Sequence, residues 1–205
     1  MYLSRLRFHA LNPDARRALQ TPYNLHAAVM GGFPNHKNAP DSRVLFRQEP
    51  SQRYSPWAEV LVQSQIPADW SRLEDSLGLA FGHQQKAFDI AVGKNQCLRF
   101  RLRANPVVTK AGKRLPVIGE EEQRGWLEQR AAKNGFALRD CTLIDEGKWQ
   151  ATKEEEGREH TIAINTVLYE GLLSVSDPGA FSHALASGIG PAKGFGCGLL
   201  SVARG

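Results

Sequence analysis

Residues 98–104 read LRFRLRA, a stretch in which apolar and basic side chains alternate one by one. Its leucines and its phenylalanine would lie on one face of an extended strand, and its three arginines on the other. Residues 2–9, YLSRLRFH, alternate in a similar way. Each of these two strands opens one half of the chain, so the sequence indicates two halves built alike.

In each half of the chain, the opening strand and the elements after it come in the same order, which is strand–helix–strand–strand–helix–strand. Thr21 is a suitable N-cap with Pro22 at the first helical position, and Gly135 suits a helix end. This order predicts an α+β protein of tandem ferredoxin-like (RRM-like, βαββαβ) domains, which we place at residues 1–94 and 95–205. The predicted helices are 12–20, 21–30, 67–78, 119–135 and 177–188, and the predicted strands are 2–9, 43–48, 57–65, 86–92, 98–104, 136–144, 160–177 and 198–204.

The composition is typical of an ordinary globular protein. The 205 residues are 41% hydrophobic and 23% charged, and no apolar run approaches the length of a transmembrane helix. The N-terminus lacks the apolar segment of a secretory signal, and the widely separated Cys97, Cys141 and Cys197 are typical of reduced thiols. We therefore expect a cytoplasmic protein without a membrane partner. No CxxC, HxH or HExxH motif occurs, so we expect neither a metal ion nor another cofactor.

Basic residues gather in one part of the chain. The net charge is +5, and residues 97–114 hold six basic residues and no acidic one. Three arginines on one face of a strand are spaced suitably for successive phosphates, which favours a nucleic-acid partner. A solvated face, or an edge strand protected by charge, is the alternative. Because the RNP1 aromatic signature is absent, recognition of an RNA duplex or hairpin by its shape fits better than base stacking on the sheet.

The stretch 188–205, GIGPAKGFGCGLLSVARG, has five glycines among its first eleven residues and one lysine, Lys193. Nucleotide-binding glycine loops run from a strand into a helix, whereas this one runs from a predicted helix into a strand. The sequence therefore argues against a mononucleotide site. It indicates a loop whose bare backbone can approach a bulky anionic partner.

Tyr23 and His26 lie three residues apart on one predicted helix and share a face. A histidine is suited to proton transfer near neutral pH, and a phenol can position a phosphate oxygen. A Tyr–His pair that merely packs or caps the helix is the alternative, and the spacing alone favours it.

Together these segments resemble the CasE-type endoribonucleases of subtype I-E CRISPR systems. The resemblance runs nearly from end to end, and the tail and the FRLRANP segment are its most specific parts. The resembling segments are MYLSRL (1–6), PYNLHAAVMGGFP (22–34), LRFRLRANP (98–106), KRLPVI (113–118), EEQRGWLEQR (121–130), TVLYEGLLSVSDP (166–178) and GIGPAKGFGCGLLSVA (188–203).

The resemblance implies a metal-independent endoribonuclease that cleaves the repeat hairpin of precursor CRISPR RNA. The upstream 2′-hydroxyl would attack the scissile phosphate and leave a 2′,3′-cyclic phosphate, with His26 as general base or acid and Tyr23 orienting the reacting groups. The protein would stay on the mature guide RNA with the other Cascade subunits, and we expect a monomer outside that complex. The expected RNA-binding residues are Arg99, Arg101, Arg103, Lys110, Lys113, Arg114, Lys153, Arg158, Gly190, Lys193, Gly194 and Gly196.

Two features depart from the family pattern. Where some relatives have a strongly basic hairpin, residues 151–160 read ATKEEEGREH, with Lys153, Arg158 and His160 beside an acidic tip. No second catalytic base is evident, since His36 is better interpreted as a surface-loop histidine. Two alternatives therefore stay open: a hairpin-binding subunit without chemistry, and a ferredoxin-like small-molecule enzyme such as a phosphatase.

Overall fold

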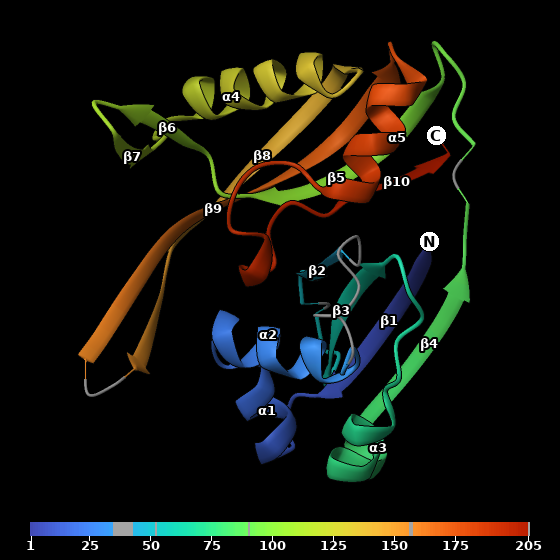
Figure 1. Cartoon of the computed structure of the whole chain (residues 1–205), viewed down its shortest axis with the longest axis vertical. Helices are drawn as coiled ribbons and strands as arrows, with labels where there is room; N and C mark the ends of the chain where they lie inside the picture. The colour runs from blue at the N-terminus through green and yellow to red at the C-terminus, as the bar shows by residue number, and fades with distance from the viewer. Residues whose placement is uncertain (35–42, 52, 90, 156–157, 205) are drawn as a thin grey trace. The chain divides into compact units, whose positions relative to one another are not determined.

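The computed structural model describes residues 1–34, 43–51, 53–89, 91–155 and 158–204, with the backbone alone for 150–155 and 158–163. The chain divides into two compact units (Figure 1). Unit 1 is Met1–Asp89 together with Gly194–Gly196, and unit 2 is Ile90–Lys193 together with Cys197–Gly205. Each unit contains one four-stranded sheet in which all neighbouring strands are antiparallel.

Unit 1 has the element order strand, two helices, two strands, helix, strand. Its elements are β1 (Tyr2–His9), α1 (Pro13–Leu19), α2 (Pro22–Gly31), β2 (Val44–Gln48), β3 (Trp57–Ser64), α3 (Ser71–Leu77), the 3₁₀ turn η2 (Gly78–Ala80) and β4 (Phe81–Ala87). The strands are ordered β2-β3-β1-β4, so the opening strand lies inside the sheet. The alternation in β1 is confirmed: Leu6 and Phe8 are fully buried, and Arg5 and Arg7 are exposed.

Local signals explain where α1 and α2 begin. Asn12 caps α1 by accepting hydrogen bonds from the amides of Asp14 and Ala15. Thr21 caps α2 by accepting from the Asn24 amide, and Pro22 occupies the first turn, as the sequence predicts. Both helices contribute buried residues to a core that includes β1, β3 and Trp70.

Unit 2 has a related order, with a hairpin and one helix after its opening strand and with two long strands, β8 and β9. Its elements are β5 (Cys97–Ala104), β6 (Val107–Lys110), β7 (Lys113–Pro116), α4 (Glu120–Lys133), β8 (Phe136–Glu155), β9 (Arg158–Val175), α5 (Pro178–Ser187), the 3₁₀ turn η3 (Lys193–Phe195), which runs into residues of unit 1, and β10 (Leu200–Arg204). The strands are ordered β10-β5-β9-β8, so here too the opening strand lies inside the sheet. Trp126 of α4 stacks on Tyr169 of β9 with ring centroids 6.4 Å apart, and Phe136 packs edge-on against Phe181 of α5.

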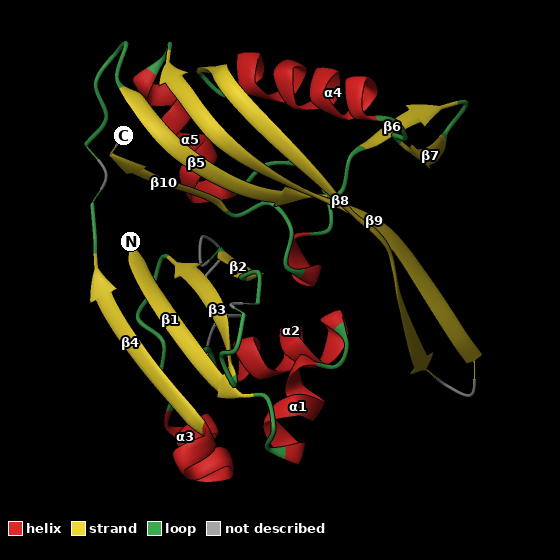
Figure 2. Ribbon diagram, turned by 180° about the vertical axis from the view of Figure 1, so that it is seen from behind, coloured by secondary structure: helices red, strands yellow, loops and turns green. Residues whose placement is uncertain are grey.

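Two features of unit 2 extend beyond its sheet (Figure 2). β9 pairs with β5 only over residues 167–174, whereas it pairs with β8 along its whole length, so the outer parts of β8 and β9 form a two-stranded ribbon. β6 and β7 form a separate two-stranded hairpin. We did not expect this hairpin from the sequence.

Two sequence expectations are wrong in detail. The strand expected at 86–92 is β4, at Phe81–Ala87. β4 is an edge strand whose last five residues are all exposed, so it lacks the apolar alternation that marks a half-buried strand. The helix expected from Asp69 begins at Ser71, although the Asp69 carboxylate does accept a hydrogen bond from the Ser71 amide.

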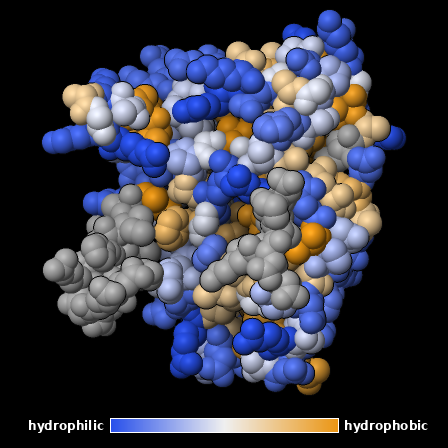
Figure 3. Space-filling model, in the orientation of Figure 1, coloured by the Kyte–Doolittle hydropathy of each residue, from blue (hydrophilic) through white to orange (hydrophobic). Residues whose placement is uncertain are grey.

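In the face drawn in Figure 3, hydrophobic residues are scattered among hydrophilic ones. Among the helices that the structure describes, none is long and apolar enough to cross a membrane.

Candidate functional site

α2 places Tyr23 and His26 on a side of the helix that differs from its buried face. Pro22, Leu25 and Val29 are buried and fix the rotation of the helix, so residues 23 and 26 fall beside that stripe. Tyr23 is 42% exposed and His26 is half-buried. The start of α2 is also tied to the preceding helix, because the Asn24 side-chain amide donates to the Arg17 carbonyl at 2.9 Å.

His26 lies close to an aromatic ring and to a glycine. The imidazole and the Phe46 ring of β2 are 6.1 Å apart between centroids, with a 36° angle between their planes. A methyl group placed on Gly194 would lie 3.7 Å from both Nδ1 and Cε1 of His26, which is ordinary van der Waals contact. The backbone at Gly194 therefore passes close to the imidazole, whose Nδ1 is buried.

The glycine-rich stretch runs from α5 to β10, as the sequence predicts, and is tightly organised. Gly190 and Gly196 both have φ of +80°, a conformation that favours glycine. Within unit 2, the Lys193 ammonium donates to the Gly190 carbonyl at 2.6 Å. Lys193 thus closes the loop on itself, and because an ammonium has three N–H donors, the same group can also contact an anion.

The arginines of β5 are on one face, as expected, but the three side chains have different surroundings. Arg99 is exposed. Arg101 is half-buried and forms an ion pair with Glu170 of β9. Arg103 is 5% exposed and holds both oxygens of the Glu146 carboxylate at 2.6 Å, with its guanidinium 5.5 Å from the Trp149 ring.

This difference corrects the picture of a strand that presents three equivalent guanidinium groups. A buried guanidinium held in a bidentate ion pair is costly to withdraw from its carboxylate. We therefore expect Arg103 to have a structural role in unit 2, whereas Arg99 is exposed and the Arg101 side chain is partly exposed.

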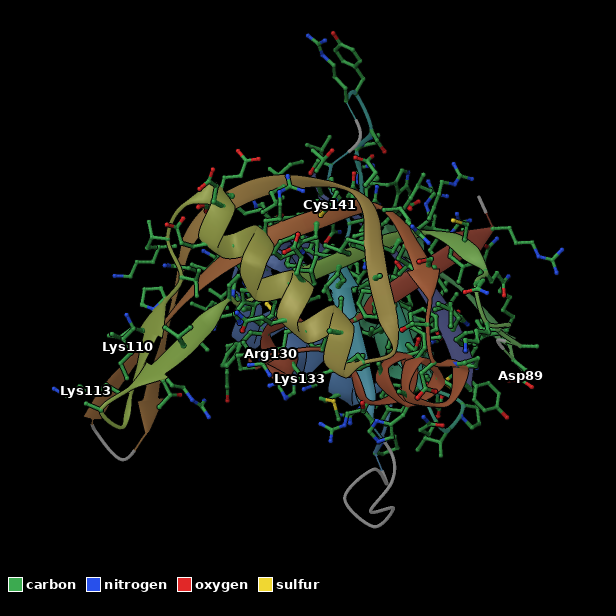
Figure 4. All side chains as sticks on the ribbon, turned by 90° about the horizontal axis from the view of Figure 1, so that it is seen from above. Asp89, Lys110, Lys113, Arg130, Lys133 and Cys141 are labelled. Atoms are coloured by element: carbon green, nitrogen blue, oxygen red, sulfur yellow. The ribbon has the colours of Figure 1, made fainter. Side chains whose placement is uncertain are left out.

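The hairpin of β6 and β7 carries the remaining basic residues of the 97–114 stretch. Lys110 and Lys113 are directly opposite each other at its turn, and Arg114 is opposite Thr109. All residues from Val108 to Pro116 are exposed. Figure 4 shows Lys110 and Lys113 at the outer end of the hairpin. Because like charges at opposed positions destabilise a strand pair, this tip is better suited to an anionic partner than to isolation.

Other expected residues are only partly described. Lys153 and Arg158 lie on the ribbon, where Lys153 pairs with His160 and Arg158 with Glu155 along the backbone. The side chains of 150–163 are outside the description, and His36 lies outside the described residues altogether. Within the described part of the chain, no three His, Cys, Asp or Glu side chains gather in a group able to hold a metal ion.

Phe46 in unit 1 and the β6–β7 hairpin in unit 2 are two features that we did not predict from the sequence. Phe46 stands in a short apolar strand, and nothing local marks it as a neighbour of His26. The hairpin had a usable signal, since TKAGKR places Ala111-Gly112 between two short strand-like runs, and both residues have positive φ.

The fold and these residues define a CRISPR-associated protein. Residues 1–204 match the family described as "CRISPR associated protein", and the chain belongs to that family. It is similar to the CRISPR-associated endoribonuclease Cse3 of Thermus thermophilus, with 34% identity over 99% of this chain and 100% of that protein. It is also similar to the Cascade subunit CasE of Escherichia coli, with 33% identity over 99% of each chain. The solved structure of the CRISPR endoribonuclease Cse3 bound to 19 nt RNA superimposes with a TM-score of 0.89 at 32% identity, and each chain is covered completely.

Proposed function

We propose that the protein is a metal-independent endoribonuclease that cleaves the repeat hairpin of precursor CRISPR RNA and retains the product. The observation that carries this proposal is the Tyr23–His26 pair of α2, in which Tyr23 is exposed and His26 is half-buried beside Gly194, in a chain that aligns from end to end with a CRISPR endoribonuclease. The proposal includes membership of a Cascade complex in the cytoplasm, because the E. coli relative is named as a subunit of Cascade. Outside that complex we expect a monomer.

The proposed reaction needs one proton acceptor and one proton donor. The 2′-hydroxyl oxygen attacks the adjacent phosphorus, and the bond from phosphorus to the 5′-oxygen of the next nucleotide breaks. The products are a 2′,3′-cyclic phosphate and a 5′-hydroxyl. His26 either removes the proton from the 2′-hydroxyl or supplies one to the leaving oxygen. Tyr23 orients the attacking hydroxyl or a phosphate oxygen, since its phenol is exposed one helical turn away.

We assign RNA contacts first to four exposed basic residues of unit 2, which are Arg99, Lys110, Lys113 and Arg114. We also assign them to Lys153 and Arg158 of the ribbon. Gly190, Lys193, Gly194 and Gly196 would lie along the RNA backbone, where amides and one ammonium meet phosphates. Arg101 and Arg103 form ion pairs with carboxylates, and we expect them to support this surface instead of contacting phosphate themselves.

We also infer two ferredoxin-like domains, at residues 1–94 and 95–205, whose bounds differ slightly from those of the two compact units. The support is the element order in each unit and the strand orders β2-β3-β1-β4 and β10-β5-β9-β8, which are equivalent. This arrangement gives RNA-binding proteins a rigid scaffold from which helices and loops present the reactive groups.

The test is cleavage of an end-labelled repeat hairpin from the protein's own CRISPR array, with the protein in excess and EDTA present. The proposal predicts cleavage at one phosphate, a cyclic phosphate end, and no reaction when the attacking 2′-hydroxyl is replaced by hydrogen. Tight binding without cleavage would identify a hairpin-binding subunit instead. Cleavage that requires a divalent ion would contradict the proposed chemistry.

A further inference from the structure

Unit 1 has a sheet face that its own helices do not cover. Leu6 and Phe8 point from β1 into the core beneath α1, α2 and α3, and Arg5 and Arg7 point to the opposite face. Because paired residues lie on the same side, this face also includes Glu59 of β3. Its polar side chains interact with one another: Arg5 donates to Gln84 at 2.7 Å, and Arg7 is 3.6 Å from Glu59.

An aromatic residue stands at the end of this face. Trp57 is the first residue of β3 and pairs with His9 of β1. The Arg7 guanidinium carbon is 4.9 Å from the centre of the Trp57 ring, and the His9 ring meets the indole edge-on with centroids 4.9 Å apart. Trp57 and His9 are half-buried, so part of each ring reaches solvent beside the exposed Arg7.

The loop that leads into Trp57 presents a second aromatic–cation pair. Tyr54 is 90% exposed, and the Arg53 guanidinium carbon is 5.3 Å from its ring centre. Tyr54 has φ of +68°, which is uncommon for a bulky residue and costs free energy. The backbone that follows is held firmly, since the Ser55 hydroxyl accepts from the Trp57 amide at 3.1 Å and the Pro56 carbonyl accepts from the Ala10 amide at 2.7 Å.

An exposed ring in a strained and anchored position contributes little to the core, so its use lies outside the fold of this unit. Exposed aromatic rings interleaved with guanidinium groups are the general means of holding single-stranded nucleic acid, because every base has a face that stacks and every nucleotide a phosphate. An acidic protein segment would use the cations of this surface but would have no need of the ring.

We propose that Tyr54, Arg53, Trp57 and Arg7 form a binding surface for single-stranded RNA. The occupant is the guide segment on the 5′ side of the repeat hairpin, present in both the precursor and the retained product; this choice rests on the proposed function. A base stacks on the Tyr54 ring, and the guanidinium groups of Arg53 and Arg7 contact the phosphates on either side. Trp57 forms the inner end of the surface and keeps Arg7 in place.

Three RNAs test this surface. One is the repeat hairpin with a 2′-deoxy substitution at the scissile position, the second is the same hairpin with a single-stranded 5′ extension of about eight nucleotides, a length that such surfaces contact, and the third is the extension alone. Equilibrium binding to the intact protein measures the factor by which the extension tightens hairpin binding. For the parent we expect about tenfold, the effect of one stacked base.

Two substitutions of Tyr54 separate stacking from folding. Tyr54→Phe keeps the ring and retains this factor, whereas Tyr54→Asn, whose side chain tolerates positive φ, loses most of it. Arg72→Ala, at an exposed arginine of α3, is the matched control for charge and retains the factor. The extension alone binds the parent more tightly than it binds Tyr54→Asn.

The outcomes distinguish this inference from the proposed function. An extension that adds no affinity to the parent, or adds the same factor to Tyr54→Asn, overturns the inference while hairpin binding upholds the function. If the protein fails to bind the hairpin but binds the extension alone in a way that depends on Tyr54, the inference stands and the proposed function is overturned. Binding of an acidic protein at this surface in place of RNA also overturns the inference.

Discussion

Removal of the Glu146 carboxylate distinguishes a structural Arg103 from an RNA-binding one. The Arg103 side chain is 5% exposed and that of Glu146 is 17% exposed, and two contacts of 2.6 Å join them. Breaking a buried ion pair by removing one partner costs about 3–5 kcal/mol, because the remaining charge is left in a poorly solvated site. Since Glu146 retains some exposure, we expect Glu146→Ala to lower the unfolding free energy of unit 2 by about 3 kcal/mol.

The assay has to report on unit 2 alone, because a chain of two units need not unfold in one step. Hydrogen exchange of the β5 and β9 amides, followed against urea, gives that reading. Arg99→Ala is the control: Arg99 is exposed, so its loss should change stability by less than about 0.5 kcal/mol. The same variant should weaken hairpin binding.

The decisive variant removes the whole pair. Arg103→Met combined with Glu146→Leu replaces both charges with apolar groups of similar size, a change that is often neutral for stability. We expect this double variant to fold and to bind the repeat hairpin as the parent does. A loss below about 1 kcal/mol in Glu146→Ala, where a buried pair should cost several times more, would refute the structural role. A folded double variant with weakened hairpin binding would refute it too.

The remaining predictions concern the hairpin, the end of α2 and a buried thiol. Alanine at both Lys110 and Lys113 should reduce the salt dependence of RNA-hairpin binding by about 0.9 in log–log slope for each phosphate that the variant no longer neutralises. Thermal stability should not fall, because the two ammonium groups repel each other in the free protein. A lower melting temperature would contradict this. Gly32→Ala would place a methyl 2.4 Å from the buried Trp70 ring, so it should lower the free energy of urea unfolding by about 1–3 kcal/mol and slow cleavage. Adding Trp70→Leu should restore part of both. A Gly32→Ala protein with parental stability and cleavage rate would be evidence against this contact. Burial raises the pKa of Cys197 to about 12 from an ordinary 9.0. The stability that this thiol contributes is complete below pH 9.0 and should decline as the pH rises toward 12, because the unfolded chain loses this proton first. Calorimetry of Cys197→Ala should show a shallower alkaline decline in stability, and a decline identical to that of the parent would contradict the assignment.

The sequence predicted best those elements whose signals are local. α2 was predicted from Thr21 and Pro22 because a cap and a first-turn proline act on the residues beside them. The two faces of β1 and β5 followed from alternation, which is a property of any strand with one buried side. β4 was predicted too far along the chain, at 86–92, because an exposed edge strand needs no such pattern.

What the sequence could not predict depends on residues distant along the chain. In the sequence, Arg103 has the same place in the alternating pattern as Arg99, and its burial depends on Glu146, 43 positions away. The neighbours of His26 come from β2 and from Gly194, near the other end of the chain, and no local pattern links them to α2. The sequence placed Tyr23 and His26 on one helix, and the family resemblance supplied their expected roles, but their surroundings could not be predicted.

Single-turnover cleavage of the repeat hairpin by the parent and by His26→Ala, in EDTA and with hairpin affinity measured in parallel, tests the central claim most directly. General acid–base catalysis contributes about 10²–10⁴-fold, so the substitution should slow cleavage by that factor and leave hairpin affinity within about twofold of the parent. A His26→Ala protein that cleaves at the parental rate would show that His26 does not transfer the proton and would contradict the account.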